Sequence, residues 1–299
     1  MQARSSSRYS PFSTQPPRFY NRGMPGQLYM IGTPIGNLQD LTPRAAETLK
    51  RLDLLYCEDT RRTMRLLAHV GAAVPLRPLP DDAPPPAWQR AIGEVQSGKA
   101  VGFVTEAGMP GVSDPGRKLV RAAWRAGHAP IVIPGPGAVS ALLALCPFVE
   151  SSFRFAGFPP RKAGERTAFV TTLASSAEPV FLFEAPSRVH GLIDAIAAAV
   201  EAEREILIGR EMTKLHEQCL LFTAGQWTSL RESIPPRGEF TVAVAGRPPA
   251  KKAVPIAEAK LALQRLASAG FSQRDAVRAL AAVWDLPANE IRRIAYAQR

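Results

Sequence analysis

The stretch LYMIGTPIGNLQDLTPRAAETL, residues 28–49, combines a short apolar run, a loop rich in proline and glycine, and the beginning of a helix. Residues 28–32 predict a buried strand, because the run is short and ends at turn-forming residues. Thr42 followed by Pro43 is typical of a helix start, where a hydroxyl caps the first turn and proline takes the first helical position. The order of strand, loop and helix favours an α/β fold with a candidate ligand loop at residues 33–41.

The same alternation of apolar runs and helical segments continues to about residue 147. Further strands are predicted at residues 54–57, 100–105 and 130–133. Helices are predicted at residues 43–51, 61–70, 88–97, 118–126 and 138–145. Apolar strands separated by helices favour a mainly parallel sheet that is covered on both faces, and residues 27–147 are therefore assigned to an N-terminal α/β domain.

Proline, glycine and aromatic residues then interrupt the alternation, and a second α/β domain is predicted at residues 148–247. We expect antiparallel pairing among its strands. The strands are predicted at residues 180–183, 205–209, 218–222 and 239–245, and the helices at residues 165–174 and 188–199. Thr223 and Gln226 have the spacing of a capping box for a short helix.

The two ends of the chain are predicted to lie outside this two-domain body. Residues 1–26 are rich in Ser, Pro and Arg without apolar periodicity, which predicts a disordered basic tail. A linker at residues 247–255 leads to helices at residues 256–268, 272–283 and 287–297, which predict a small helical domain at residues 254–299. Its core is expected from Leu261, Leu263, Leu266, Ala276, Leu280, Val283, Ile291 and Ile294.

The composition is that of an ordinary globular protein, with 46% hydrophobic residues in a chain of 299. No apolar run approaches the roughly 20 residues that cross a bilayer, so we expect a soluble, cytoplasmic protein. The cysteines Cys57, Cys146 and Cys219 lie in apolar stretches and are expected to be core residues. Their spacing predicts neither a disulfide framework nor a metal site.

The positive charge of the chain is concentrated at its ends. Of the net charge of +11, residues 1–26 carry +4 and residues 251–299 carry +5. Basic ends on a nearly neutral body favour attraction to a polyanion such as nucleic acid. A merely solvated basic surface is the alternative that charge leaves open.

Three loops of the first domain follow predicted strands and are dense in glycine and proline, at residues 33–41, 105–116 and 134–139. Ligands of open parallel sheets bind beyond the carboxyl ends of the strands. The loops have no phosphate-binding motif, and Glu106 and Asp114 would suit a cationic group such as a sulfonium. Loops of this composition also occur in α/β proteins without a ligand role.

Eight motifs in one order resemble the ribosomal RNA small subunit methyltransferase I family, within the tetrapyrrole methylase superfamily. The motifs are TPIGNLQDLTPRA, CEDTRRT, EAGMPGVSDPG, PGPGAVSALLA, GFPPRK, FEAPSR, REMTKLHE and RGEFTVAV. The resemblance implies two α/β domains with S-adenosylmethionine in the cleft between them, a homodimer, and methylation of a cytidine 2′-hydroxyl in the decoding region of small-subunit (16S) ribosomal RNA.

Carried over position by position, the resemblance implies a set of cofactor-binding residues. From the first domain these are Pro34, Gly36, Asn37, Glu106, Ala107, Gly108, Pro110, Pro136, Ala138 and Ser140. From the second domain they are Gly157, Phe158, Ala185, Glu211, Thr213, Gly238 and Phe240.

Methyl transfer to a hydroxyl requires alignment of the reacting atoms and is helped by a base. Asp59 and Glu58 are candidates for that base because they end a predicted strand, although a helix-capping role explains them equally well. Glu184 is a further catalytic candidate. The candidates for contact with RNA phosphates are Arg61, Arg161, Lys162, Arg274, Arg278, Arg292 and Arg293, for several of which a solvated surface is the alternative.

Two other functions stay open on the sequence. A tetrapyrrole could replace RNA as the substrate, or the protein could be a non-catalytic RNA-binding or assembly factor of the same fold. The second alternative arises because the Glu106 and Asp81–Asp82 loops depart from the residues usual in the family. Met109 and Ser187 are further departures.

Overall fold

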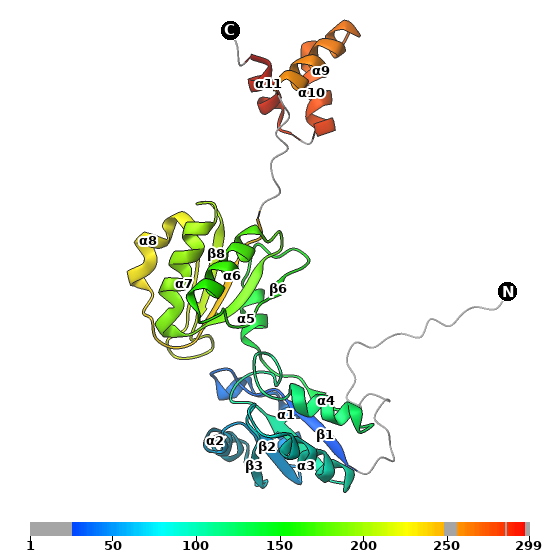
Figure 1. Cartoon of the computed structure of the whole chain (residues 1–299), viewed down its shortest axis with the longest axis vertical. Coiled ribbons are helices and arrows are strands. Elements are labelled where there is room, and N and C mark those ends of the chain that lie inside the picture. The colour runs from blue at the N-terminus through cyan, green and yellow to red at the C-terminus, as the bar shows by residue number, and fades with distance from the viewer. Residues whose placement is uncertain (1–25, 248–255, 285, 297–299) are drawn as a thin grey trace, which may run out of the picture. The chain divides into compact units, whose positions relative to one another are not determined.

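The computed structural model describes residues 26–247, 256–284 and 286–296. The chain divides into two compact units, residues 1–246 and residues 247–299, and the first unit contains two sheets (Figure 1). Residues 1–25 of the predicted tail and most of the predicted linker at residues 247–255 lie outside the described residues.

The first sheet is entirely parallel and has the strand order β3-β2-β4-β1-β5. Its strands are β1 (Gln27–Ile31), β2 (Leu54–Cys57), β3 (Leu76–Pro78), β4 (Ala100–Val104) and β5 (Ile131–Ile133). The predicted parallel sheet is therefore confirmed. The sequence missed β3, because this edge strand is only three residues long and two of them are exposed.

Helices cover both faces of this sheet, as the apolar runs predicted. The helices are α1 (Pro43–Leu49), α2 (Thr60–Val70), α3 (Pro85–Gln96) and α4 (Arg117–Arg125), with the short 3-10 helix η1 (Leu38–Asp40) before α1. Leu54 and Tyr56 of β2 pack with α3 and α4, whereas Leu55 and Cys57 pack with α1 and α2. A strand buried on both faces has no polar positions, which explains its continuous apolar sequence.

The second sheet is mixed and has the order β6-β7-β10-β8-β9, with every pair antiparallel except β6 and β7. Its strands are β6 (Arg154–Phe155), β7 (Val180–Glu184), β8 (Glu205–Arg210), β9 (Gln218–Thr223) and β10 (Phe240–Val244). The expected antiparallel pairing is confirmed. The two-residue strand β6 is too short to leave a pattern in the sequence.

The helices α6 (Ala163–Ser175) and α7 (Pro186–Ala199) cover one face of the second sheet. After β9 follow η2 (Ala224–Gln226), α8 (Trp227–Leu230) and η3 (Arg231–Ser233). The predicted capping box is present, since Thr223 and Gln226 satisfy each other's backbone N–H groups.

The other face of the second sheet is covered by α5 (Ala138–Ala144), which follows directly on β5 of the first sheet. Leu142 of α5 is fully buried against Phe181, Leu207 and Ala243. The loop that precedes α5 therefore runs from the edge of one sheet to the face of the other. The domain boundary at residue 147 stays a prediction, with α5 packed on the second sheet.

The second unit consists of α9 (Ile256–Ser268), α10 (Gln273–Trp284) and α11 (Ala288–Tyr296) around Val277, Leu280 and Ile291. The prediction of Leu261 and Val283 as core residues is wrong, because they are 48% and 73% exposed. At about 100° per residue, Leu261 points away from the face that holds Ala259 and Leu263. In α10, Trp284 packs on the core in place of Val283. Nothing is described of the Ile294 side chain.

Candidate functional site

The three loops rich in glycine and proline lie together at the carboxyl ends of the strands of the first sheet, because β4, β1 and β5 are parallel neighbours. Thr33 and Gly108 form an isolated antiparallel bridge, in which each residue donates its N–H to the carbonyl of the other at 2.9 and 3.0 Å. The loops after β1 and β4 are thus joined by backbone hydrogen bonds and hold a fixed spacing.

A cavity of about 580 Å³, called here the large cavity, opens where these loops meet the second sheet. Ala107, Gly108, Gly135 and Ala138 form its side in the first sheet's loops. The opposite side contains Phe158, Phe183, Glu184, Gly238 and Phe240. The cavity is of the size and apolar character typical of sites for small organic ligands.

Among the described residues, the large cavity is lined by one cation, Arg62, and by five carboxylates, those of Glu58, Glu106, Asp114, Glu184 and Glu239. Burial, followed by the charges of the neighbouring carboxylates Glu58, Glu106 and Glu239, raises the pKa of Asp114 to about 7. Burial, followed by the charge of Glu106, also raises the pKa of Glu58. Neighbouring carboxylates contribute to both shifts after burial, and this crowding of negative charge favours a cationic ligand.

Glu184 is the most deeply buried of these acids, with its side chain fully inaccessible. It forms an ion pair with Arg188, one helical turn further on, and one carboxylate oxygen accepts the Ala185 N–H at 2.7 Å. Its other oxygen, Oε2, and Nη1 of Arg188 are buried without a hydrogen-bond partner among the described residues. A buried acceptor at the wall of a cavity is available to a donor group of a ligand.

A second cavity of about 330 Å³, called here the small cavity, adjoins the first. Residues that line the small cavity but not the large one include Pro34, Gly36, Arg65 and Lys214. The residues common to both cavities are Ile35, Arg62, Glu106, Ala107 and Glu239. Within this shared wall, Arg62 Nη1 lies 2.5 Å from Glu106 Oε2, so an ion pair lines both cavities.

Gly36 lies where the loop after β1 meets the loop between β8 and β9. A Cβ atom at residue 36 would overlap Lys214 Cγ and lie 2.8 Å from Thr213 Oγ1. Lys214 cannot move away freely, since its ammonium group pairs with Glu211 at 2.8 Å and Glu239 at 3.1 Å. Glycine is therefore required for the close approach of these two loops.

Gly36→Ala should destabilise the folded protein by about 1–3 kcal/mol, the usual range for overpacking. Thermal denaturation monitored by circular dichroism measures the change. Gly93→Ala is the matched control, because a Cβ at this position on α3 meets nothing within 4 Å and alanine favours a helix. Equal melting temperatures for the two variants would show that the loop has room for a side chain.

Comparisons with known proteins identify the family. The model of the tetrapyrrole (corrin/porphyrin) methylase family matches residues 27–227. A relative from Thermotoga maritima named ribosomal RNA small subunit methyltransferase I is 37% identical over 222 residues, which cover 74% of this chain and 99% of the relative. The chain belongs to the ribosomal RNA small subunit methyltransferase I family. A relative of the same name from Synechocystis sp. is 35% identical over 268 residues, covering 89% of this chain and 96% of the relative.

These two relatives of the methyltransferase I family differ in extent. The Thermotoga match accounts for nearly the whole relative in 222 residues, about the size of the two-sheet unit alone. The Synechocystis match, at 268 residues, is longer than that unit. The Thermotoga relative is therefore too short to contain both a two-sheet unit of this size and a set of C-terminal helices like that of this chain.

A solved structure of uroporphyrin-III C-methyl transferase from Thermus thermophilus, complexed with S-adenyl homocysteine, has the same fold as this family member. The TM-score is 0.52 at 16% identity, and the match covers 74% of this chain and 97% of that chain. At this identity the likeness supports the fold alone, and it confirms the predicted tetrapyrrole methylase architecture.

Seven of the eight family motifs contribute to the wall of the large cavity, and the eighth, REMTKLHE, supplies Lys214 to the small one. The predicted cofactor residues at the large cavity are Glu106, Ala107, Gly108, Ala138, Ser140, Phe158, Ala185, Gly238 and Phe240. Pro34 and Gly36 line only the small cavity. Asn37, Pro110, Pro136, Gly157, Glu211 and Thr213 line neither of the two cavities.

Two of the three predicted catalytic residues, Glu58 and Glu184, line the large cavity. Asp59 lines neither cavity. It is the N-cap of α2, where its carboxylate accepts the Arg61 N–H at 2.8 Å, a hydrogen bond that lowers the pKa of Asp59. The structure thus contains the hydrogen bond that the helix-capping interpretation of Asp59 requires.

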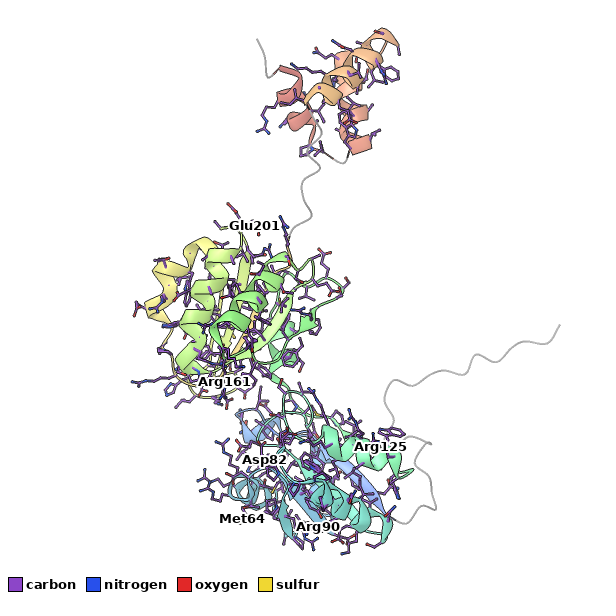
Figure 2. All side chains as sticks on the ribbon, in the orientation of Figure 1. Met64, Asp82, Arg90, Arg125, Arg161 and Glu201 are labelled. Atoms are coloured by element: carbon purple, nitrogen blue, oxygen red, sulfur yellow. The ribbon has the colours of Figure 1, made fainter. Side chains whose placement is uncertain are left out.

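The predicted RNA-binding residues are exposed and line neither cavity. Arg61 pairs with Asp59, Lys162 pairs with Glu165, and Arg161 lies on the surface before α6 (Figure 2). The arginines of the second unit, Arg274, Arg278, Arg292 and Arg293, are also exposed. Their roles stay predictions.

The sequence did not identify several residues at the cavities, notably Arg62, Arg65 and Glu239. Glu239 lies inside the RGEF motif, between the predicted residues Gly238 and Phe240, so its position next to them could have identified it. No pattern in CEDTRRT distinguishes Arg62 from Arg61, because the choice depends on where α2 begins. The helix starts at Thr60, and it is Arg62 that reaches Glu106.

No group of three or more His, Cys, Asp or Glu side chains that could hold a metal ion occurs within the described part of the chain. Across the same residues, no helix has both the length and the apolar character of a membrane span. Cys57 is buried and Cys146 is partly buried, but Cys219 is exposed, so its prediction as a core residue is wrong.

Proposed function

We propose that this protein methylates the 2′-hydroxyl of a cytidine in the decoding region of small-subunit ribosomal RNA, using S-adenosylmethionine. The observation that carries the proposal is the convergence of seven family motifs on one cavity. Relatives that share more than a third of the aligned residues are named ribosomal RNA small subunit methyltransferase I. The Thermotoga relative is about as long as the two-sheet unit alone. We therefore assign the methyl transfer to the two-sheet unit.

The large cavity fits the proposed cofactor. S-adenosylmethionine, when bound, supplies a methyl group activated by a positively charged sulfur. The carboxylates of Glu106 and Asp114 would balance that charge, and the free Oε2 of Glu184 could accept a hydrogen bond from an amino or hydroxyl group. Ala107, Gly108 and Ala138 would let the ligand approach the backbone closely.

The hydroxyl proton needs an acceptor inside the cavity. Glu58 and Asp114 line the cavity, and both have a raised pKa, so they are stronger bases than ordinary carboxylates. A base with a pKa near the working pH is the most effective kind. We therefore propose Asp114, with Glu58 as its neighbour, as the proton acceptor.

The proposal extends to partners. The substrate would be ribosomal RNA or the small ribosomal subunit, reached in the cytoplasm, and the protein would work as a homodimer. The exposed arginines of α10 and α11 would add affinity for RNA phosphates.

Calorimetry with S-adenosylmethionine, followed by methyl transfer to small subunits from a strain that lacks the gene, tests the proposal. We expect one cofactor per chain and a new 2′-O-methylcytidine peak in nucleoside mass spectrometry. Glu47→Ala, an exposed change on α1 away from both cavities, is the control for handling of the protein. Cofactor binding without a change in the ribosomal nucleosides would overturn the RNA assignment.

A further inference from the structure

The two adjoining cavities have opposite charge. The large cavity presents five carboxylates and one guanidinium, whereas the small cavity presents Arg62, Arg65 and Lys214 against Glu106 and Glu239. A cation is favoured in the first and an anion in the second. Two ligands of opposite charge could thus bind side by side and meet at the shared wall.

The cations of the small cavity come mainly from α2. Arg62 and Arg65 are three residues apart in the first two turns, so their side chains lie on the same side of the helix. Arg62 is held by Glu106 at 2.5 Å. For Arg65, which is exposed, no ion pair is found within the described residues. Its guanidinium is therefore available to a ligand.

The loop after β1 forms part of the wall of the small cavity. Thr33, Pro34, Ile35 and Gly36 line the cavity, and the bridge between Thr33 and Gly108 fixes this loop against the next one. Lys214 packs against Gly36 of this loop and is held by Glu211 and Glu239. The small cavity thus combines a loop fixed by backbone hydrogen bonds with the guanidinium of Arg65, for which no ion pair is found within the described residues.

We propose that the small cavity holds the ribose-phosphate backbone of the target nucleotide, with Arg65 and Arg62 contacting its phosphates. This inference rests on the proposed function, because it places RNA beside the cofactor cavity. The ribose then lies beside the Arg62–Glu106 pair, and its 2′-hydroxyl extends past this pair into the large cavity, where it meets the methyl group and the proposed proton acceptor. Arg65 acts as a substrate-binding residue that does not touch the cofactor.

Arg65→Ala tests the inference, because Arg65 lines the small cavity but not the large one. A lost phosphate contact should raise the KM for small subunits about five- to tenfold and reduce the salt dependence of binding by about one counterion. The kcat and the affinity for S-adenosylmethionine should stay within about twofold of the unchanged protein, since the large cavity is intact. Arg65→Lys keeps the charge and should recover most of the KM.

Arg90→Ala is the matched control, because Arg90 is an exposed arginine of α3 that lines neither cavity (Figure 2). If Arg65→Ala and Arg90→Ala have the same KM and salt dependence while the unchanged protein methylates RNA, the inference is overturned and the proposed function stands. If the unchanged protein binds S-adenosylmethionine but methylates no ribosomal RNA, both are overturned together.

Discussion

Glu184→Ala should destabilise the folded protein by about 3–5 kcal/mol, because it removes one partner of a buried ion pair and leaves the other charge without compensation. The Glu184 side chain is fully inaccessible and the Arg188 side chain is 22% exposed. Nη1 of Arg188 already has no hydrogen-bond partner among the described residues. Losing Glu184 would also remove the acceptor of the Ala185 N–H at the start of α7.

Urea denaturation followed by tryptophan fluorescence measures the loss. Glu47→Ala is the matched control, since Glu47 pairs with Lys50 and Arg51 on the surface of α1, where both partners are well exposed. Exposed pairs contribute at most about 1 kcal/mol, so this control should move little. Equal losses in the two variants would show that solvent reaches the Glu184–Arg188 pair.

Glu184→Gln separates the structural role of this residue from its role in the cavity. Glutamine keeps an oxygen that can accept the Ala185 N–H, but it removes a negative charge from the cavity wall. We expect a stability closer to that of the unchanged protein, together with weaker binding of a cationic ligand. The two Glu184 variants therefore distinguish support of the fold from recognition of charge.

The arrangement of the loops could be predicted from the sequence because buried parallel strands leave a strong signal. Residues 54–57 are a continuous apolar run, and residues 138–144 are apolar except for Ser140 and follow a glycine. Both elements were found within one residue of their bounds. The short strands β3 and β6 left no comparable signal. Their pairing depends on neighbouring strands, which a local pattern cannot report.

The site was harder to predict, because side-chain direction depends on tertiary contacts. Asp59 and Arg61 were plausible by position, but the capping of α2 engages both, and Arg62 points to the cavities instead. Lys214 is far from the glycine-rich loops in sequence and reaches Gly36 only because the second sheet places it there. Such contacts between sheets have no local sequence signature.

Asp114→Asn should change how stability and cofactor affinity depend on pH. The Asp114 pKa rises from 3.8 to about 7 on folding, through burial and the charges of Glu58, Glu106 and Glu239. Between these pH values the folded state holds a proton that the unfolded state has released, so the free energy of unfolding falls as pH increases through this range. Asparagine cannot titrate, and the variant should lose this part of the pH dependence and become relatively more stable at pH 8.

Ligand binding should follow the opposite direction. A cationic ligand beside Asp114 favours the ionised carboxylate, so the affinity of the unchanged protein for S-adenosylmethionine should increase by about tenfold between pH 6 and pH 8. If Asp114 also accepts the hydroxyl proton, kcat rises over the same interval and Asp114→Asn lowers it by about 100-fold or more. Calorimetry and single-turnover methyl transfer at several pH values measure both quantities.

Asp82→Asn provides the control for this pair of measurements, because it makes the same chemical change at an exposed aspartate that lines neither cavity (Figure 2). The control should keep the pH profile of the unchanged protein. A pH-dependent affinity that persists in Asp114→Asn would assign the titration to Glu58, the neighbour whose pKa is also raised. An affinity and a kcat that are flat with pH in the unchanged protein would remove both carboxylates from the proposed proton transfer, because a group that is ionised throughout this range gains no basicity from its surroundings.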